Sequence, residues 1–353
     1  MADASSEEHA GGGHQEAGEL TPWDRVLLDR TQQGIPLEGR PFAALARELG
    51  VPGGEEEVIE RLAGLRAAGL LRRVGAVMDS HALGYTGTLC GAEVEPEAIG
   101  ALAAYIGSYP GVTHCYEREN RYNLWFTLLA PHRALIEQVV SGVSGQAGVR
   151  ELVELPIERR YKINVAFRLG ARGSLSSTAP EAARASAGPD ARERAVIRVI
   201  QNELPLVPRP FAELAAECTR VGVALEEDEL LGELVRYRRV GYLRRVSTVL
   251  AHRRIGIAAN GMVVWSVPDE HCDRAGARAA EFEAVTHCYR RRPADRWPYN
   301  LYAMVHAGTR EECLARVAEI NARVGRYPYQ VLFSTREFKK SSMRYFCEER
   351  SDA

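Results

Sequence analysis

The chain has 353 residues, of which 46% are hydrophobic and 26% are charged. This composition is typical of a globular protein with room for two or more domains. A formal charge of −2 at pH 7 excludes a global positive field that would attract nucleic acid or an anionic membrane. Seven cysteines without a C-x-x-C pair argue against a disulfide framework and a zinc ribbon, and they indicate reduced thiols in the cytoplasm.

Residues 1–20 are rich in Glu, Gly and Ala and contain no apolar core. They therefore match neither a secretory signal nor a membrane anchor, and we expect a disordered tail. No later apolar run approaches the roughly 20 residues that a membrane helix needs.

The next segment predicts a winged-helix domain over residues 21–78. Thr21-Pro22 begins a first helix, with the hydroxyl as cap and the proline at the first helical position. Pro41 begins a second helix, and a third runs from about Glu55 until Gly69 stops it. Residues 70–78 alternate like a strand, so three helices precede a β wing.

Residues 79–170 predict a ferredoxin-like domain. The expected order is strand (85–94), helix (96–107), strand (112–117), strand (122–129), helix (131–143) and a final strand from Leu152. This β-α-β-β-α-β order is the split βαβ unit.

The second half of the chain repeats the first. The segment Gly34–Ala46 returns as Glu203–Ala215, and Val112-Thr113-His114-Cys115-Tyr116 returns as Val285-Thr286-His287-Cys288-Tyr289. We predict a flexible linker over 171–190, a second winged helix over 191–250 and a second ferredoxin-like domain over 251–347. The fold class is thus α+β, a tandem repeat of winged helix-turn-helix plus ferredoxin-like units.

The winged helices raise DNA binding as one function. A helix that enters a DNA groove needs positive charge near its start. Here the third helix begins with Glu55-Glu56-Glu57, and its counterpart with Glu226-Glu227-Asp228-Glu229. These carboxylates suit the helix dipole and repel a duplex, so we expect a structural or dimerisation role.

The chemistry-bearing residues lie in a β-hairpin of each ferredoxin-like domain. Each hairpin carries a histidine and a tyrosine on its first strand, and arginines and aromatic residues at its tip. Guanidinium forks bind carboxylates and stack on planar systems, so these hairpins suit a flat, polycarboxylated ligand. The second tip is the more basic, with Arg290, Arg291, Arg292 and Arg296.

With the Pro-Leu-x-x-Arg-Pro-Phe opening of each copy, these residues resemble the siroheme decarboxylase family, built from two related Lrp/AsnC-like subunits. The resemblance implies that both subunit types are fused here. It implies removal of two acetate carboxyls, at C12 and C18, to give 12,18-didecarboxysiroheme for heme d1 or heme. It also implies an internal pseudo-dimer, with further homo-oligomers open, and no cofactor beyond the iron of the siroheme substrate.

For catalysis we nominate His287, His114, Tyr289 and Tyr116, because protonation of the carbanion left by decarboxylation suits a histidine. A histidine or tyrosine on a strand also serves as an ordinary core residue, and both interpretations stay open. We expect substrate contacts from Arg118, Arg121, Arg290, Arg291, Arg292, Arg296, Trp297, Tyr299, Tyr122, Arg72, Arg73, Arg244, Arg245, His252, Lys162 and Lys339.

Several of these residues have an ordinary alternative. His252 is an axial ligand to the siroheme iron or a loop histidine, the wing arginines bind an anion or line a solvated strand edge, and the terminal lysines are commonly solvent-facing. Cys115 and Cys288 alternate with the histidines and are expected in the core. A DNA-binding regulator and a non-catalytic tetrapyrrole carrier or sensor remain the rival functions.

Overall fold

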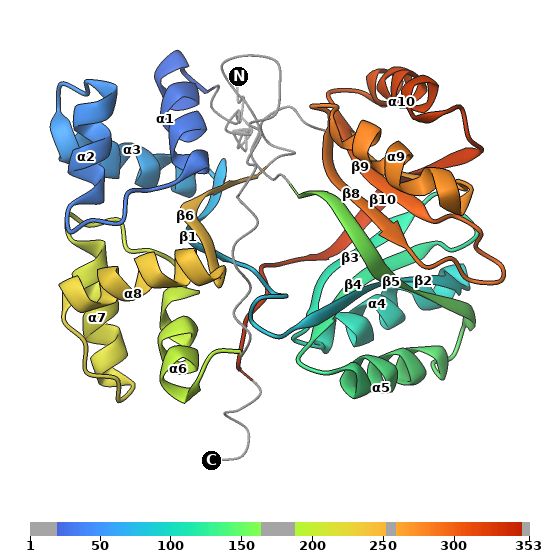
Figure 1. Cartoon of the computed structure of the whole chain (residues 1–353), viewed down its shortest axis with the longest axis horizontal. Helices are drawn as coiled ribbons and strands as arrows, with labels where there is room; N and C mark the ends of the chain where they lie inside the picture. The colour runs from blue at the N-terminus through green and yellow to red at the C-terminus, as the bar shows by residue number, and fades with distance from the viewer. Residues whose placement is uncertain (1–19, 164–187, 252–258, 348–353) are drawn as a thin grey trace, which may run out of the picture.

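The computed structural model describes residues 20–163, 188–251 and 259–347. They form two lobes, one of helices around a short sheet and one built on a β-barrel (Figure 1). Residues 1–19 of the predicted tail, most of the predicted linker and His252 lie outside the described residues. No helix of the described chain is long and apolar enough to cross a membrane.

The helical lobe contains the two predicted helix triplets. The first copy has α1 (Pro22–Gln33), α2 (Pro41–Leu49) and α3 (Gly54–Ala67), and the second has α6 (Ala191–Ile200), α7 (Pro210–Arg220) and α8 (Glu227–Val240). Thr21 caps α1 and Asp190 caps α6, each in a reciprocal capping box with the acidic residue three positions later. Gly50 adopts the left-handed conformation that ends α2.

The wing of each copy is a single strand, completed by the other copy. β1 (Leu71–Met78) pairs antiparallel with β6 (Leu243–Leu250), with Val74 opposite Thr248. One apolar core joins both triplets, and Tyr345 and Phe346 from the end of the described chain are buried in it. The two winged helices are therefore one folded body.

The second lobe confirms the ferredoxin-like order in both copies. The first copy contributes β2 (Thr86–Val94), η1 (Pro96–Ala98), α4 (Ile99–Ser108), β3 (Val112–Arg118), β4 (Leu124–Ala130), α5 (Arg133–Ser144) and β5 (Val149–Ile163). The second contributes β7 (Ala259–Trp265), α9 (Asp269–Ala280), β8 (Val285–Arg291), β9 (Leu301–Ala307), α10 (Arg310–Val324) and β10 (Tyr329–Lys340).

The eight strands close into one barrel in the order β10-β3-β4-β2-β5-β8-β9-β7. The long last strand of each copy crosses between the copies: β5 pairs with β2 and β8, and β10 pairs with β7 and β3. The helices α4, α5, α9 and α10 cover the outside of the barrel (Figure 1). The expected internal pseudo-dimer is therefore built by strand exchange.

Aromatic and aliphatic side chains fill part of the barrel interior, and we call this group the aromatic plug. Trp125 and Trp297 stand 5.3 Å apart between ring centroids, and Tyr122 lies edge-on to Trp297. Trp297 Nε1 donates to the Tyr302 hydroxyl at 2.7 Å. The full plug is Leu89, Tyr122, Trp125, Val153, Leu155, Met262, Val264, Trp297, Tyr302 and Leu332.

Candidate functional site

Strand alternation turns both predicted histidines toward the barrel interior. On β3, Cys115 packs in the helix-covered core, whereas Tyr116 lies opposite Trp125 of the aromatic plug. His114, two residues before Tyr116, therefore shares its inward face. On β8, Cys288 is likewise in the outer core and Tyr289 lies opposite Tyr302. The expectation that the cysteines are core residues is confirmed.

The two histidines have matching environments. His114 Nδ1 lies 2.9 Å from Thr113 Oγ1, and His287 Nδ1 lies 3.0 Å from Thr286 Oγ1. Burial lowers the pKa of each imidazole to about 4. Lys340 and His287 add to the lowering at His114, while Arg244 and Arg291 add to it at His287. Both histidines are therefore neutral at pH 7.

A tyrosine ring lies beside each histidine. The ring centroids of His114 and Tyr116 are 6.1 Å apart, as are those of His287 and Tyr289. Burial raises the pKa of the Tyr289 hydroxyl, so this group stays protonated and able to donate a hydrogen bond.

A buried arginine lies over each tyrosine ring and links the two copies. Arg118 donates from Nη1 to the carbonyl of Leu332 at 2.8 Å, and Arg291 donates to that of Leu155 at 2.7 Å. Desolvation lowers the pKa of Arg118 to about 10 and also lowers that of Arg291. Within the described ranges, neither guanidinium has an ion pair, and the Nε of each is buried without a partner.

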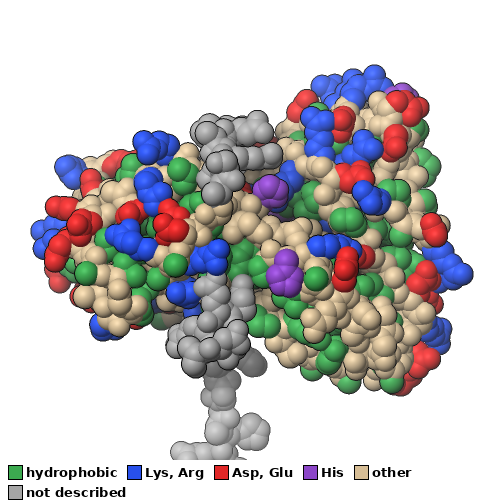
Figure 2. Space-filling view, turned by 60° about the horizontal axis from the view of Figure 1, so that its bottom comes forward, with side chains coloured by type: hydrophobic (Ala, Val, Ile, Leu, Met, Phe, Trp, Pro, Cys, Tyr) green, Lys and Arg blue, Asp and Glu red, His purple; other side chains and the backbone are tan. Residues whose placement is uncertain are grey.

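The wing strands bring two further arginines to this face. Arg72 of β1 donates to the carbonyl of Lys340 at 2.9 Å and is among the cations that lower the pKa of His114. Arg244 of β6 lowers that of His287 and forms an ion pair with Asp79 at 2.7 Å. Figure 2 shows histidine side chains, with Lys and Arg beside them, where the lobes meet. Of the four predicted wing arginines, these two face the barrel.

Two further cations lie at the same place: Arg160, which the sequence-based prediction missed, and Lys340, which follows Lys339 at the end of the last strand. Arg160 of β5 is exposed opposite Tyr289, and its charge acts on Tyr289, Arg291 and Asp79. Lys340 of β10 lies opposite His114. The positions equivalent to these two in the other copy hold Glu337 and Ile163, so a search for repeated residues passes over them.

We call this assembly the histidine cluster. It consists of two inward-facing histidine and tyrosine pairs and the cations that surround them. Its members are His114, Tyr116, His287, Tyr289, Arg72, Arg118, Arg160, Arg244, Arg291 and Lys340.

The structure corrects the expected place of Lys162 and Lys339. Bulges in β5 and β10 put them opposite Cys288 and Cys115, on the helix-covered outer face. Lys162 Nζ donates to the carbonyl of Phe282 just beyond α9, at 2.8 Å. Lys339 Nζ donates to those of Gly107 and Tyr109 at the end of α4, at 2.6 and 3.1 Å. Both lysines cap helix ends, which favour a cation.

Four of the six predicted hairpin arginines, all except Arg118 and Arg291, lie elsewhere. These four are tied to carboxylates of the outer surface, since strand alternation or the turn directs them outward. The ion pairs are Arg121 with Glu93 and Glu151, Arg290 with Glu158 and Asp269, Arg292 with Glu158, and Arg296 with Glu151.

Five further residues predicted to contact the substrate lie in packing or local hydrogen-bond contacts. Trp297 and Tyr122 belong to the aromatic plug, and Tyr299 packs against it. Arg73 and Arg245 alternate with the wing arginines that face the barrel. Arg73 donates to the Ala76 carbonyl and Arg245 to the Ser247 hydroxyl.

Family models divide the chain as the fold does. A "Siroheme decarboxylase NirDL-like HTH domain" matches residues 24–72 and 193–244, and an "AsnC-like ligand binding domain" matches residues 82–162 and 254–339. A siroheme decarboxylase of Hydrogenobacter thermophilus is 34% identical over 324 residues, covering 92% of this chain and 95% of the relative. This chain belongs to the siroheme decarboxylase family.

Two other relatives of this family add to the comparison. A crystal structure of the siroheme decarboxylase NirDL in complex with an iron-uroporphyrin III analogue has a TM-score of 0.70 and 31% identity, covering 93% of this chain and 96% of that one. A siroheme decarboxylase alpha subunit of Desulfovibrio desulfuricans is 41% identical over 43% of this chain and 86% of its own. A subunit that is separate there thus corresponds to one half of this chain.

In this family member, the acidic starts of α3 and α8 have internal partners. Glu55 pairs with Arg40 and accepts from the backbone N–H of Ala43. In the second copy, Glu227 forms the equivalent ion pair with Arg209. The repeated arginine of the Pro-Leu-x-x-Arg-Pro-Phe opening therefore anchors the following helices, which keep their carboxylates at the end that would meet DNA.

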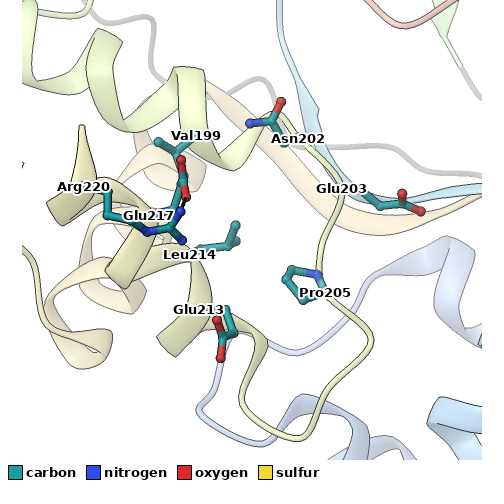
Figure 3. A pocket seen from close by; sticks show the side chains of 8 residues that line it. All are labelled: Val199, Asn202, Glu203, Pro205, Glu213, Leu214, Glu217 and Arg220. Carbon is teal, nitrogen blue, oxygen red and sulfur yellow. Dashed lines mark ion pairs between the residues drawn. The ribbon is translucent and has the colours of Figure 1, made fainter.

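A surface pocket lies between α6 and α7, apart from every predicted site residue (Figure 3). Val199 of α6 and Glu217 of α7 line it, and Glu217 forms an ion pair with Arg220. The first copy has Arg30 in place of Val199, bound to Glu48 at 2.6 and 2.8 Å. The pocket therefore marks a substitution between copies, and we assign it no role in the site.

Proposed function

We propose that this chain is a siroheme decarboxylase, a carboxy-lyase that removes the C12 and C18 acetate carboxyls of siroheme to give 12,18-didecarboxysiroheme. Family membership supports the activity. The histidine cluster supports the substrate class, because it gathers cations around aromatic rings and neutral imidazoles.

The observation that carries the proposal is the lack of charge compensation at two buried arginines. Arg118 and Arg291 are each about 95% buried, and within the described chain neither forms an ion pair. A buried unpaired charge is costly, so an anionic ligand at this position gains charge-assisted hydrogen bonds. A polycarboxylated macrocycle supplies the anions and a flat face for the tyrosine rings.

The chemistry needs a place where a carboxylate is destabilised and a carbon is protonated. Loss of carbon dioxide from a ring acetate leaves a carbanion-like methylene that the macrocycle delocalises. The aromatic plug beside the histidine cluster gives the reacting carboxylate an apolar neighbour, which favours loss of its charge. A histidine then donates the proton, and we assign this step to His287 or His114, with Tyr289 and Tyr116 as hydrogen-bond donors.

We further propose that the reaction needs no cofactor beyond the iron of the substrate. His252, outside the described residues, remains our candidate axial ligand to that iron. We place the activity in the cytoplasm, because the seven cysteines form no disulfide and reduced thiols are usual there.

The test is anaerobic incubation of the purified chain with siroheme, followed by mass spectrometry. The expected product has lost two carboxyl groups as carbon dioxide. The double variant His114→Ala/His287→Ala is expected to bind siroheme without converting it. Siroheme that binds the wild-type chain tightly and is recovered unchanged would show a carrier or sensor instead.

A further inference from the structure

A threonine hydroxyl connects two histidines in the second copy. Thr286 Oγ1 lies 3.0 Å from His287 Nδ1 and 3.0 Å from His306 Nε2. Thr286 is 1% exposed, so water does not compete for its hydroxyl. His306, Thr286 and His287 thus form a hydrogen-bonded chain that leads from β9 to the histidine cluster.

The first copy has the same threonine without the second histidine. Thr113 Oγ1 lies 2.9 Å from His114 Nδ1 and 2.8 Å from Thr127 Oγ1. Leu129 occupies the position of His306, and Met304 occupies that of Thr127. The hydrogen-bonded chain that begins at His287 Nδ1 therefore ends in a titratable side chain, whereas the one that begins at His114 Nδ1 contains only hydroxyls.

The single hydroxyl proton couples the two imidazoles. When His306 carries a proton on Nε2, that N–H donates to Thr286 Oγ1, and the threonine proton must point to His287 Nδ1. His287 then holds its own proton on Nε2, which has no hydrogen-bond partner among the described residues. When His306 Nε2 is bare, it accepts from Thr286, and His287 donates from Nδ1 instead.

We infer that His306 is a positioning residue that acts through Thr286 to set, and to replenish, the proton on His287. The inference rests on the proposed decarboxylation. As the substrate carbanion takes the proton from His287 Nε2, Thr286 passes its proton to Nδ1 and receives the one on His306 Nε2. Protonated His306 becomes neutral, the carbon gains one C–H bond, and His306 is reprotonated by solvent.

This arrangement answers a difficulty at His287. Its pKa of about 4 keeps the ring neutral near pH 7, and a neutral imidazole gives up a proton only if another reaches its second nitrogen. Arg244 of β6 and Arg291 of β8 act on His287, Arg160 of β5 acts on Tyr289 beside it, and His114 of β3 is electrostatically coupled to it. The arginine charges disfavour a positive charge on His287. The proton that His287 loses from Nε2 must therefore be replaced at Nδ1, through Thr286.

The first test is NMR of histidine-labelled full-length protein between pH 5 and 8, which needs no substrate. The ring-nitrogen chemical shifts of His287 are expected to report a switch of its tautomer as His306 titrates. His306→Leu, which installs the first-copy residue, and Thr286→Val should each abolish that switch, and the matched control Thr113→Val should leave it intact. An unchanged switch in His306→Leu and Thr286→Val would overturn the inference, whether or not the chain decarboxylates siroheme.

The second test separates proton supply from orientation. His306→Gln keeps a side-chain N–H donor to Thr286 but has no proton to pass on. It should hold His287 in one tautomer at every pH and still lower the single-turnover rate by about a hundredfold, within the range of general acid catalysis, with siroheme affinity unchanged. A wild-type rate in His306→Gln would rule out proton supply. An inactive wild-type chain with an intact NMR switch would refute only the proposed function.

Discussion

Arg291 of the second copy donates a hydrogen bond from Nη1 to the backbone carbonyl of Leu155 of the first copy, over 2.7 Å. Arg118 and Leu332 repeat the contact in the opposite direction at 2.8 Å. The two halves are thus joined through buried cations that lie over the tyrosines of the histidine cluster.

The first prediction concerns the function of that buried charge. Arg291→Met should weaken siroheme binding at least about tenfold, since a hydrogen bond to a charged group contributes about 1.5–3 kcal/mol. The free energy of unfolding should change by less than about 1 kcal/mol, because removal of an unpaired buried charge offsets the lost hydrogen bond. Binding titration and urea unfolding measure the two effects. Arg292→Met at the outer surface is the control, and unchanged affinity with a large stability loss would make Arg291 purely structural.

The second prediction concerns stability against pH. Both cluster histidines have a folded pKa of about 4, below the value of about 6.5 expected when unfolded. Unfolded histidine takes up protons first as the pH falls, so stability is full above about pH 6.5 and declines toward pH 4. We expect a loss on the order of 1–3 kcal/mol per histidine.

Urea unfolding of the wild type and of His114→Gln/His287→Gln at pH 7 and pH 4.5 measures this contribution. The variant should lose less stability over the interval. Asp24 and Asp79, whose pKa values are lowered by Arg61 and Arg244 against the effect of burial, contribute to both proteins, so only the difference counts. Equal losses would show that the histidines are not desolvated.

The third prediction tests the corrected role of two lysines. Lys162→Met and Lys339→Met should each lower the free energy of unfolding by about 0.5–1.5 kcal/mol through loss of a helix cap. Siroheme turnover should stay near the wild-type rate. Lys340→Met, beside His114, should show the opposite pattern. A tenfold fall in turnover for Lys162→Met would indicate that Lys162 contributes to the site after all.

The fourth prediction uses the difference between the copies at the α6–α7 pocket. Val199→Arg should fill it and pair with Glu217, raising the free energy of unfolding by about 0.5 kcal/mol. Arg30→Val should remove the corresponding pair and lower stability by a similar amount. Thermal unfolding measures both changes. The gain should vanish when Glu217→Gln is added, and a gain that survives would come from packing alone.

Much of the fold was predictable because local signals agree with it. The Thr21 cap, Pro41 and Gly50 mark helix ends in the sequence, and the alternation around His114 and His287 fixes which face holds the cysteines. The repeat itself predicted a pseudo-dimer. The strand exchange by β5 and β10 was not predictable, because partner choice depends on contacts between distant segments.

The site was only partly predictable, for a geometric reason. The histidines, tyrosines, Arg118 and Arg291 were found because both copies carry them on one strand. Bulges in β5 and β10 break the two-residue alternation, so Lys162 and Lys339 were expected where Arg160 and Lys340 lie. The exposed tip arginines were predicted to contact the substrate. Their actual partners are protein carboxylates that come close to the tip only in the folded chain.

The crossing of β5 and β10 between the copies also bears on aggregation. An open sheet presents unpaired N–H and C=O groups along its edge strands, which invite other strands. In the closed barrel every edge is taken up by the opposite half. Either half expressed alone would expose such edges, and the nearest partner for them is another copy of itself. Fusion in one chain keeps the complementary edge nearby. It therefore favours pairing between the two different halves over pairing between two identical halves.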